Sequence, residues 1–267
     1  MSRRWALGIA YLGSSYCGWQ WQYGQPSIQA EVEKALSNIA DSKVQTICAG
    51  RTDAGVHAFC QVVHFETDCI RSREAWIHGT NTCLPDQISV LWAEPVDDRF
   101  HARFSARWRR YRYIIRRESP RCGLWTNRVW HCYYSLDIKA MVMAADFLPG
   151  ERDFSAFRSA GCQSRSPKRC LDSIRIYDYS PWLVIDVQAN AFLHNMVRII
   201  VGCLLDVGKG KHEPGWIKSV LDSKDRRLGG VTAPAQGLYF TGAFYPNYPA
   251  IPCLLPSGSE FNGFPFY

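Results

Sequence analysis

The segment best suited to chemistry is GRTDAGVHA at residues 50–58, which carries one carboxylate, Asp53, on a short loop. Residues 44–49 before it and 59–67 after it are rich in β-branched and aromatic residues, a pattern that predicts strands. Two glycines flank the carboxylate and allow tight turns or the close approach of a ligand. An ordinary hairpin with Asp53 in an Asx-turn would use the same residue types, so the loop alone leaves both interpretations open.

A second stretch, AFLHNMVRIIVGCLL at residues 191–205, carries a single formal charge, Arg198, in an apolar helical repeat. Arginine keeps its proton, and a buried unpaired charge is costly. Arg198 therefore needs a carboxylate partner or an open cavity. We predict that it pairs with Asp53 inside a cleft. The alternatives are a pair with a surface aspartate and exposure to solvent past Asn195.

Positive charge is concentrated in residues 99–128, which contain ten arginines and one acid, Glu118. The local balance of +9 leaves −2 for the rest of a chain whose net charge is +7. The forked guanidinium suits phosphate oxygens, so the tract predicts RNA binding, with Arg109 and Arg110 expected to contact the RNA backbone. Tyr111 lies among these arginines, where it could stack on a base or fill a core. An ordinary solvated face is the alternative for the whole tract.

Composition narrows the class of protein. The chain has 267 residues, 47% of them hydrophobic, and its first apolar run is too short for a signal peptide. No stretch is long enough to span a membrane, so we expect a cytoplasmic protein. The eleven cysteines are odd in number and lack a CxxC pair, which predicts reduced, mostly buried thiols. The seven histidines show no metal-ligand spacing, so no metal site is expected.

Hydrophobic periodicity predicts an α+β fold with a mostly antiparallel sheet. Helices are expected over residues 28–39, 72–82, 137–148, 191–205 and 216–221. Strands are expected over residues 4–11, 44–49, 59–67, 88–96, 107–117, 171–179, 182–189 and 237–245. Strands and helices alternate in a similar way in residues 1–104 and 105–245, which predicts two related α/β lobes, followed by an irregular tail at 246–267.

Five ordered blocks resemble the tRNA pseudouridine synthases of the TruA type. They are YLGSSYCGWQ at 11–20, GRTDAGVHA at 50–58, RYRYII at 110–115, FLHNMVRIIVG at 192–202 and APAQGLYF at 233–240. The resemblance covers the chain to about Tyr245. One departure is Leu12, which stands where that family usually has an aspartate.

This resemblance implies a fold and an activity. The fold would be two α/β lobes that share an extended, mostly antiparallel sheet with a basic central cleft. The activity would be isomerisation of uridine to pseudouridine at positions 38, 39 and/or 40 of the tRNA anticodon arm, without a metal or organic cofactor. The implied assembly is a homodimer whose two subunits together hold the tRNA.

The resemblance also implies roles for individual residues. Asp53 matches the catalytic aspartate, and Arg198 matches the arginine that pairs with it. Arg51 matches the residue that helps displace the target base. Tyr111 matches the tyrosine that stacks on uracil, and Leu238 matches the apolar contact to the base.

Two other functions are compatible with the residue types. A non-catalytic RNA-binding module would use the arginine tract and its aromatic residues, but would need neither Asp53 nor Arg198. A metal-dependent nuclease could use Asp53 with His57, although no second acid lies in that loop.

Overall fold

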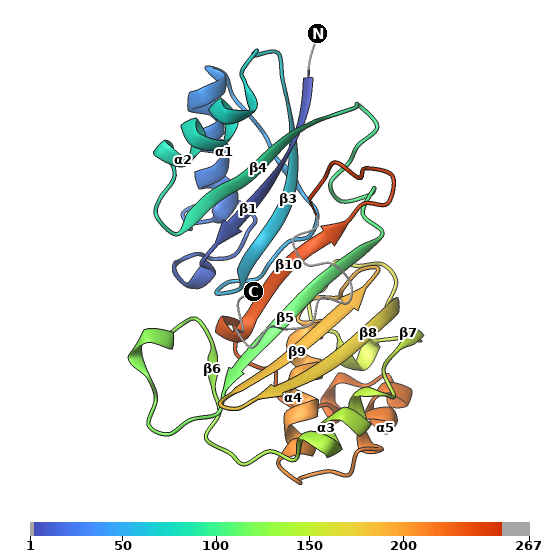
Figure 1. The fold of residues 1–267 in the computed structure, drawn as a ribbon. Coiled ribbons are helices and arrows are strands. Elements are labelled where there is room, and N and C mark those ends of the chain that lie inside the picture. Colours follow the sequence, from blue (N-terminus) through green and yellow to red (C-terminus); the bar gives the residue numbers. More distant parts are fainter. Residues whose placement is uncertain (1–2, 253–267) are drawn as a thin grey trace. The chain divides into compact units, whose positions relative to one another are not determined.

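The computed structural model describes residues 3–252, which fold as two units (Figure 1). Unit 1 comprises residues 3–109 together with 239–252, and unit 2 comprises residues 110–238. Both units mix helices with β-strands, which confirms the predicted α+β class. The last strand contributes most of its residues to unit 1, whereas the sequence pattern places it with the second lobe. Most of the predicted tail lies outside the described residues.

Unit 1 is built on strands in the order β4-β1-β3-β10 (Figure 1). β1 is antiparallel to both β3 and β4, whereas β10 pairs with β3 in parallel through Tyr239 and Phe240. The short strand β2 pairs with β3 at residues 63–64, away from the residues of β3 that pair with β10. The strands are β1 (Arg3–Tyr11), β2 (Ile47–Cys48), β3 (His57–Thr67), β4 (Ile88–Val96) and β10 (Leu238–Phe244).

Helix α1 (Ile28–Ala40) begins where the sequence predicts. Ser27 Oγ accepts a hydrogen bond from Ala30 N (3.4 Å) at its N-terminus, and Asp41 ends the helix in the left-handed conformation. Figure 1 shows α1 and α2 beside β1 and β4. The helix expected over 72–82 is present but irregular, since a π-turn (Ala75–Gly79) leads into α2 (Thr80–Cys83).

β2 is shorter than the strand predicted over 44–49, and side chains of α1 explain the difference. Glu33 Oε1 accepts from Thr46 N (2.7 Å), and Ser37 Oγ accepts from Val44 N (2.9 Å). Backbone groups that a neighbouring strand would otherwise pair are therefore satisfied by the helix.

Unit 2 contains strands in the order β5-β9-β8-β7, with β6 parallel to β5. The strands are β5 (Trp108–Arg116), β6 (Trp130–His131), β7 (Gly150–Asp153), β8 (Lys168–Tyr179) and β9 (Trp182–Ala189). The helices are α3 (Ile138–Ala145), α4 (Met196–Gly208) and α5 (Trp216–Ser223). The sequence pattern does not predict β6 and β7, because strands this short carry too few residues to show a period.

Helix α4 forms the apolar centre of unit 2. Every one of its residues is buried except Arg198, which is half-buried. This confirms the predicted buried helix around Arg198. The helix begins at Met196 and not at residue 191, and it extends to Gly208, so it also contains a second charge, Asp206, which pairs with Lys211 (2.9 Å). Within residues 3–252, six short 3₁₀ or π turns connect the elements, among them Gly13–Ser15 before the candidate loop and Ala235–Gly237 before β10.

The cysteines of residues 3–252 are all free thiols, which confirms the prediction of reduced cysteines for this part of the chain. The expectation that most are buried is wrong, because only Cys60, Cys132 and Cys203 are fully buried there. Among the same residues, no helix is both long and apolar enough to cross a membrane.

Candidate active site

The loop that carries Asp53 is anchored through its neighbour Thr52. Trp19 N donates to Thr52 O (3.0 Å), and Thr52 Oγ1 lies 2.8 Å from Tyr11 Oη in the core. Gly18 has φ +93°, and a Cβ there would lie 2.6 Å from Thr52 O. Only glycine therefore allows the backbone at this position to come so close to the loop. Asp53 itself is half-buried. The block at 11–20 therefore packs against the loop and supports it.

His57 fixes the other end of this loop. Its ring is fully buried, its Nδ1 accepts from Gly13 N (2.9 Å), and it packs 4.7 Å from the ring of Tyr239. Val56 N donates to Asp53 O (3.1 Å), which closes the turn. His57 is thus a structural residue of the loop. In the part of the chain that the structure describes, no three histidine, cysteine or acidic side chains gather as potential metal ligands.

Arg109 connects this loop with the segment before β5. Its Nε donates to Ala49 O (3.3 Å), and its Nη1 donates to Ala106 O (2.8 Å). Gln61 Nε2 donates to Gly50 O (2.5 Å) beside it. Arg109 is half-buried in these contacts, so its contact with the RNA backbone stays a prediction. Arg51, at the start of the loop, is exposed.

Arg198 is oriented inside unit 2 by two acceptors. Its Nε donates to Ala233 O (2.7 Å), and its Nη1 donates to Asn195 Oδ1 (2.7 Å). Asn195, in the left-handed conformation, also donates from Nδ2 to Ser159 Oγ (3.0 Å). These contacts hold the guanidinium in one direction. The pairing of Arg198 with Asp53 stays a prediction.

Tyr111 and Leu238 are both buried residues of unit 2. The ring of Tyr111 meets that of Phe192 edge-on, with 5.0 Å between the centroids. Their contacts with a target base stay predictions. Unit 2 thus holds three of the candidate residues, Tyr111, Arg198 and Leu238, whereas Asp53 and Arg51 belong to unit 1.

Tyr113 is a structural residue that is not among the candidates predicted from the sequence. Its Oη donates to Pro234 O (2.7 Å), and a Cβ on Gly237 would lie 2.5 Å from its ring. Burial raises the pKa of Tyr113 well above its usual value, so the phenol stays a hydrogen-bond donor. Tyr113 therefore holds the 233–237 segment, which also accepts the bond from Arg198. The sequence signal for Tyr113 was its two-residue spacing from Tyr111, which places both side chains on the same face of a strand.

Arg110 belongs to a buried charge cluster on β5 and β9. Its Nε lies 2.5 Å from Asp186 Oδ1, and Arg112 Nε lies 3.3 Å from Asp186 Oδ2. Asp186 is 4% exposed, Arg112 2% and Arg110 9%. Burial lowers the pKa of Arg112, and the charge of Asp186 opposes that shift. Contact of Arg110 with RNA stays a prediction, because a guanidinium bound to a buried carboxylate is not freely available.

Two further arginines of the tract form ion pairs, one with the tract's own acid and one with an acid distant in sequence. Arg116 pairs with Glu118, and Arg117 pairs with Asp178 of β8. The tract is therefore less basic in space than its local sequence indicates. The arginines that remain exposed are Arg99, Arg103, Arg107, Arg121 and Arg128.

Comparison with known proteins shows the family of this chain. The family model described as tRNA pseudouridine synthase matches residues 8–105 and 144–246. The chain is 49% identical to a tRNA pseudouridine synthase A of Colwellia psychrerythraea, over 91% of this chain and 94% of the relative. It is 50% identical to the Vibrio parahaemolyticus protein of that name (96% and 97%) and 52% identical to that of Coxiella burnetii (90% and 92%).

A solved structure titled as a Cbf5-Nop10-Gar1 complex is 10% identical, with a TM-score of 0.38, over 88% of this chain and 48% of that one. The family-model match and the curated relatives together define the class, that of enzymes that isomerise uridine in RNA. Within that class, the chain belongs to the tRNA pseudouridine synthase family.

Proposed function

We propose that this tRNA pseudouridine synthase acts on uridines 38, 39 and/or 40 of the anticodon arm, with Asp53 as its catalytic residue. The observation that carries the proposal is the loop at 50–58. It lies in the part of the chain that the family model matches, and its backbone is held from both sides while Asp53 is only half-buried. A carboxylate on a rigid loop is what reaction at a sugar carbon requires.

The reaction breaks the N1–C1′ bond of uridine and forms a C5–C1′ bond, while the proton on C5 is lost and N1 gains one. The isomerisation is neither a redox reaction nor a hydrolysis, so a carboxylate suffices as the reacting group. Asp53 would either attack C1′ or abstract a proton from the sugar, and both routes are open to an ionised carboxylate. Exclusion of water would keep the detached uracil in place for reattachment.

The other candidate residues would prepare the base for this step. Unstacking a base costs about a few kcal/mol, and in this proposal Arg51 displaces the target base while Tyr111 and Leu238 receive it. Arg198 would favour the charged form of Asp53. Its support from Asn195 and Ala233 is consistent with a guanidinium that must point in a set direction.

We further propose that the enzyme works as a homodimer in the cytoplasm, with both subunits contacting one tRNA. The free thiols among residues 3–252 suit a reducing compartment. Sedimentation analysis of the protein, alone and with tRNA, tests the assembly. A single copy on each tRNA would contradict the shared binding.

The central experiment is Asp53→Asn, which removes the reactive carboxylate at nearly constant volume. We expect pseudouridine formation to fall at least about a thousandfold, with tRNA affinity kept within about threefold, because the carboxylate acts on the reaction and not on binding. Mapping of pseudouridine in tRNA, with a binding titration beside it, measures both. Asp68→Asn, at an exposed position of unit 1, is the matched control.

Retained activity in Asp53→Asn would remove Asp53 from the mechanism. Loss of both binding and thermal stability would assign it a folding role. If the unchanged protein binds tRNA tightly and forms no pseudouridine, the non-catalytic RNA-binding alternative holds.

A further inference from the structure

The segment between β4 and β5 exposes an aromatic ring for which neither the fold nor the proposed mechanism has a use. Phe104 is 75% exposed. Three arginines beside it in the sequence, Arg99, Arg103 and Arg107, are also exposed. An exposed aromatic ring with arginines on both sides of it in the chain is an arrangement that a base-stacking site uses.

The tip of this segment is closed by hydrogen bonds on both sides of the ring. His101 Nδ1 accepts from both Arg103 N and Phe104 N (3.2 Å each). His101 N donates to Ser105 Oγ (3.0 Å), and Ser105 N donates back to His101 O (2.9 Å). Two backbone donors at the tip are thus satisfied by one imidazole, which also stacks 4.3 Å from the Phe104 ring.

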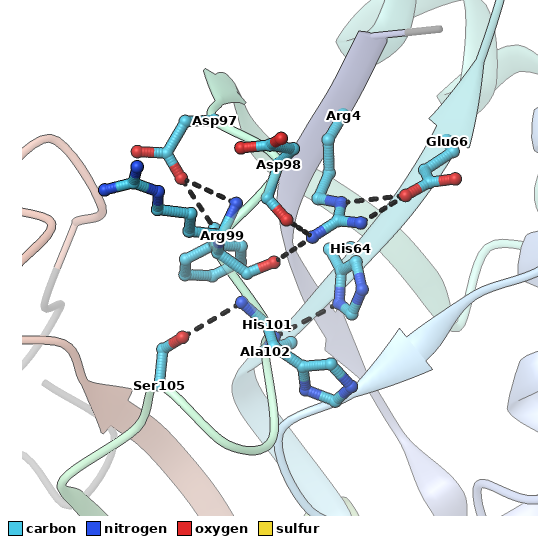
Figure 2. A network of polar contacts seen from close by, with 10 residues as sticks. Arg4, His64, Glu66, Asp97, Asp98, Arg99, His101, Ala102 and Ser105 are labelled. Carbon is cyan, nitrogen blue, oxygen red and sulfur yellow. Dashed lines mark hydrogen bonds and ion pairs between the residues drawn. The ribbon is translucent and has the colours of Figure 1, made fainter.

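The base of the segment is bonded to the sheet of unit 1, as Figure 2 shows for Arg4, His64 and Ala102. Ala102 N donates to His64 Nδ1 (3.1 Å), and Tyr245 Oη donates to Ala102 O (2.6 Å). Arg4 Nη1 donates to Phe100 O (2.7 Å). A loop fixed at this many points loses little entropy when a ligand binds to its tip.

Arg109 links the same segment to the candidate catalytic loop. One guanidinium donates to Ala106 O (2.8 Å) and to Ala49 O (3.3 Å), just before residues 50–58. It also donates to Arg103 O, next to the exposed ring. A ligand on Phe104 would therefore be bound to a surface that is braced against the Asp53 loop.

The chemistry of the tip favours a nucleobase. His101 covers one side of Phe104, and the guanidinium carbon of Arg103 lies 5.6 Å from the ring centroid. The nearby acid Asp97 is engaged, since its Oδ1 accepts from Arg99 N and Phe100 N (3.0 Å each). Asp98 is exposed as well, so the exposed charged residues of 97–107 are three arginines and two acids. The two charged residues that flank the ring most closely in the chain, Arg103 and Arg107, are both cationic, which suits an RNA strand.

We propose that Phe104 is a stacking site for an unpaired base of the tRNA substrate, with Arg103 and Arg107 bound to the adjoining phosphates. The inference rests on the proposed function for the identity of the RNA. It adds a binding site outside the five residues assigned above, on a segment that none of them occupies.

The test compares ring and non-ring substitutions at one position in the full-length protein. We expect Phe104→Ala to weaken tRNA binding about 5- to 100-fold. Phe104→Trp should restore binding, whereas Phe104→Leu, which is apolar without a ring, should not. Ile70→Ala is the matched control, because Ile70 is exposed in the same unit. Thermal unfolding of each variant should match that of the parent protein.

Salt dependence separates the ring from the arginines. Phe104→Ala should leave the slope of log affinity against log salt unchanged, whereas Arg107→Gln should reduce it by about 0.7–0.9. Equal tRNA affinity in Phe104→Ala and the parent would overturn the stacking site. A changed oligomeric state of Phe104→Ala with RNA binding intact would also overturn the stacking site, because the ring would then belong to a protein–protein interface. Pseudouridine mapping with the parent protein tests the proposed function independently.

Discussion

At the scale of single residues, the loop at 50–58 turns neighbouring side chains in different directions. Thr52 points into the core and meets Tyr11, while Arg51 is exposed and Asp53 is half-buried. The buried hydroxyl contact therefore sets where the carboxylate stands. Arg198 is held in a comparable way by Asn195. Residues that touch no substrate thus decide the geometry of those proposed to do so.

A substitution series at Arg198 tests its proposed pairing with the carboxylate. We expect Arg198→Gln to lower kcat about a hundredfold, because an oriented charge beside the reacting group is lost. Arg198→Lys should recover part of that loss, and tRNA affinity should change less than about threefold in both. Single-turnover rates with separate binding titrations measure the split. Equal rates in the Gln and Lys variants would show that charge is not what Arg198 contributes.

At the scale of elements, the pairing of β5 with β9 in unit 2 converts two arginines of a basic strand into partners of one buried acid. Asp186 lies against both Arg110 and Arg112. Burying three charges is stabilising only while all of them remain paired. Loss of Asp186 would therefore remove the counter-charge of both arginines.

Asp186→Asn tests that cluster. We expect unfolding free energy to fall by about 3–5 kcal/mol, because two buried guanidinium groups lose their counter-charge. Urea unfolding followed by circular dichroism measures it. Asp222→Asn is the control, since Asp222 forms an exposed pair with Lys218 and should change stability by less than about 0.5 kcal/mol. Similar stability of both variants would mean that Asp186 does not stabilise the fold as the counter-charge of the two buried guanidinium groups.

The contact of His64 with the segment after β4 predicts a pH dependence. Burial, with a smaller contribution from His101 and Arg4, lowers the pKa of His64 to about 4. Between that value and the ordinary pKa near 6.5, the unfolded chain binds a proton that the folded protein excludes, so stability falls as pH decreases. We expect a loss of about 1–2 kcal/mol between pH 7 and pH 5.

Urea titrations at the two pH values, on the parent and on His64→Asn, measure this contribution. Asparagine can still accept the bond from Ala102 N but does not titrate, so its pH-dependent loss should be smaller. An equal loss in both proteins would place the effect at other groups.

At the scale of the whole molecule, the net charge differs from the charge that is exposed and available to bind RNA. The chain carries +7, yet several arginines of the 99–128 tract are matched by acids in space. Affinity for RNA should depend on the exposed members, because each phosphate contact releases counterions. Counting arginines along the sequence therefore overestimates the binding surface.

Arg121→Gln and Arg110→Gln test this difference. If Arg121 contacts a phosphate, its loss should reduce the slope of log affinity against log salt by about 0.7–0.9. We expect Arg110→Gln to leave the slope unchanged and to lower the unfolding free energy, because Arg110 is bound to Asp186. Binding titrations between 50 and 200 mM salt measure the slope. A reduced slope for Arg110→Gln would support the RNA-backbone contact that the sequence predicts.

Most of the elements, and the family, followed from sequence alone. The Ser27 cap and the apolar stripe after it predicted α1, and the apolar repeat around Arg198 predicted α4, because helix signals are local. The loop around Asp53 was recognisable for the same reason, since its glycines, acid and flanking strands lie within a few residues of one another.

Tertiary structure alone decided which groups those elements meet. Glu33 shortens β2 from a neighbouring helix, His57 receives Gly13, and Asp186 reaches Arg110 from a strand 76 residues away. Phe104 likewise became a candidate site only when its ring proved exposed on a bonded loop. Periodicity and capping arise from a chain's nearest neighbours, whereas ion pairing and burial depend on which strands and helices pack together, and a single sequence carries no local trace of that choice.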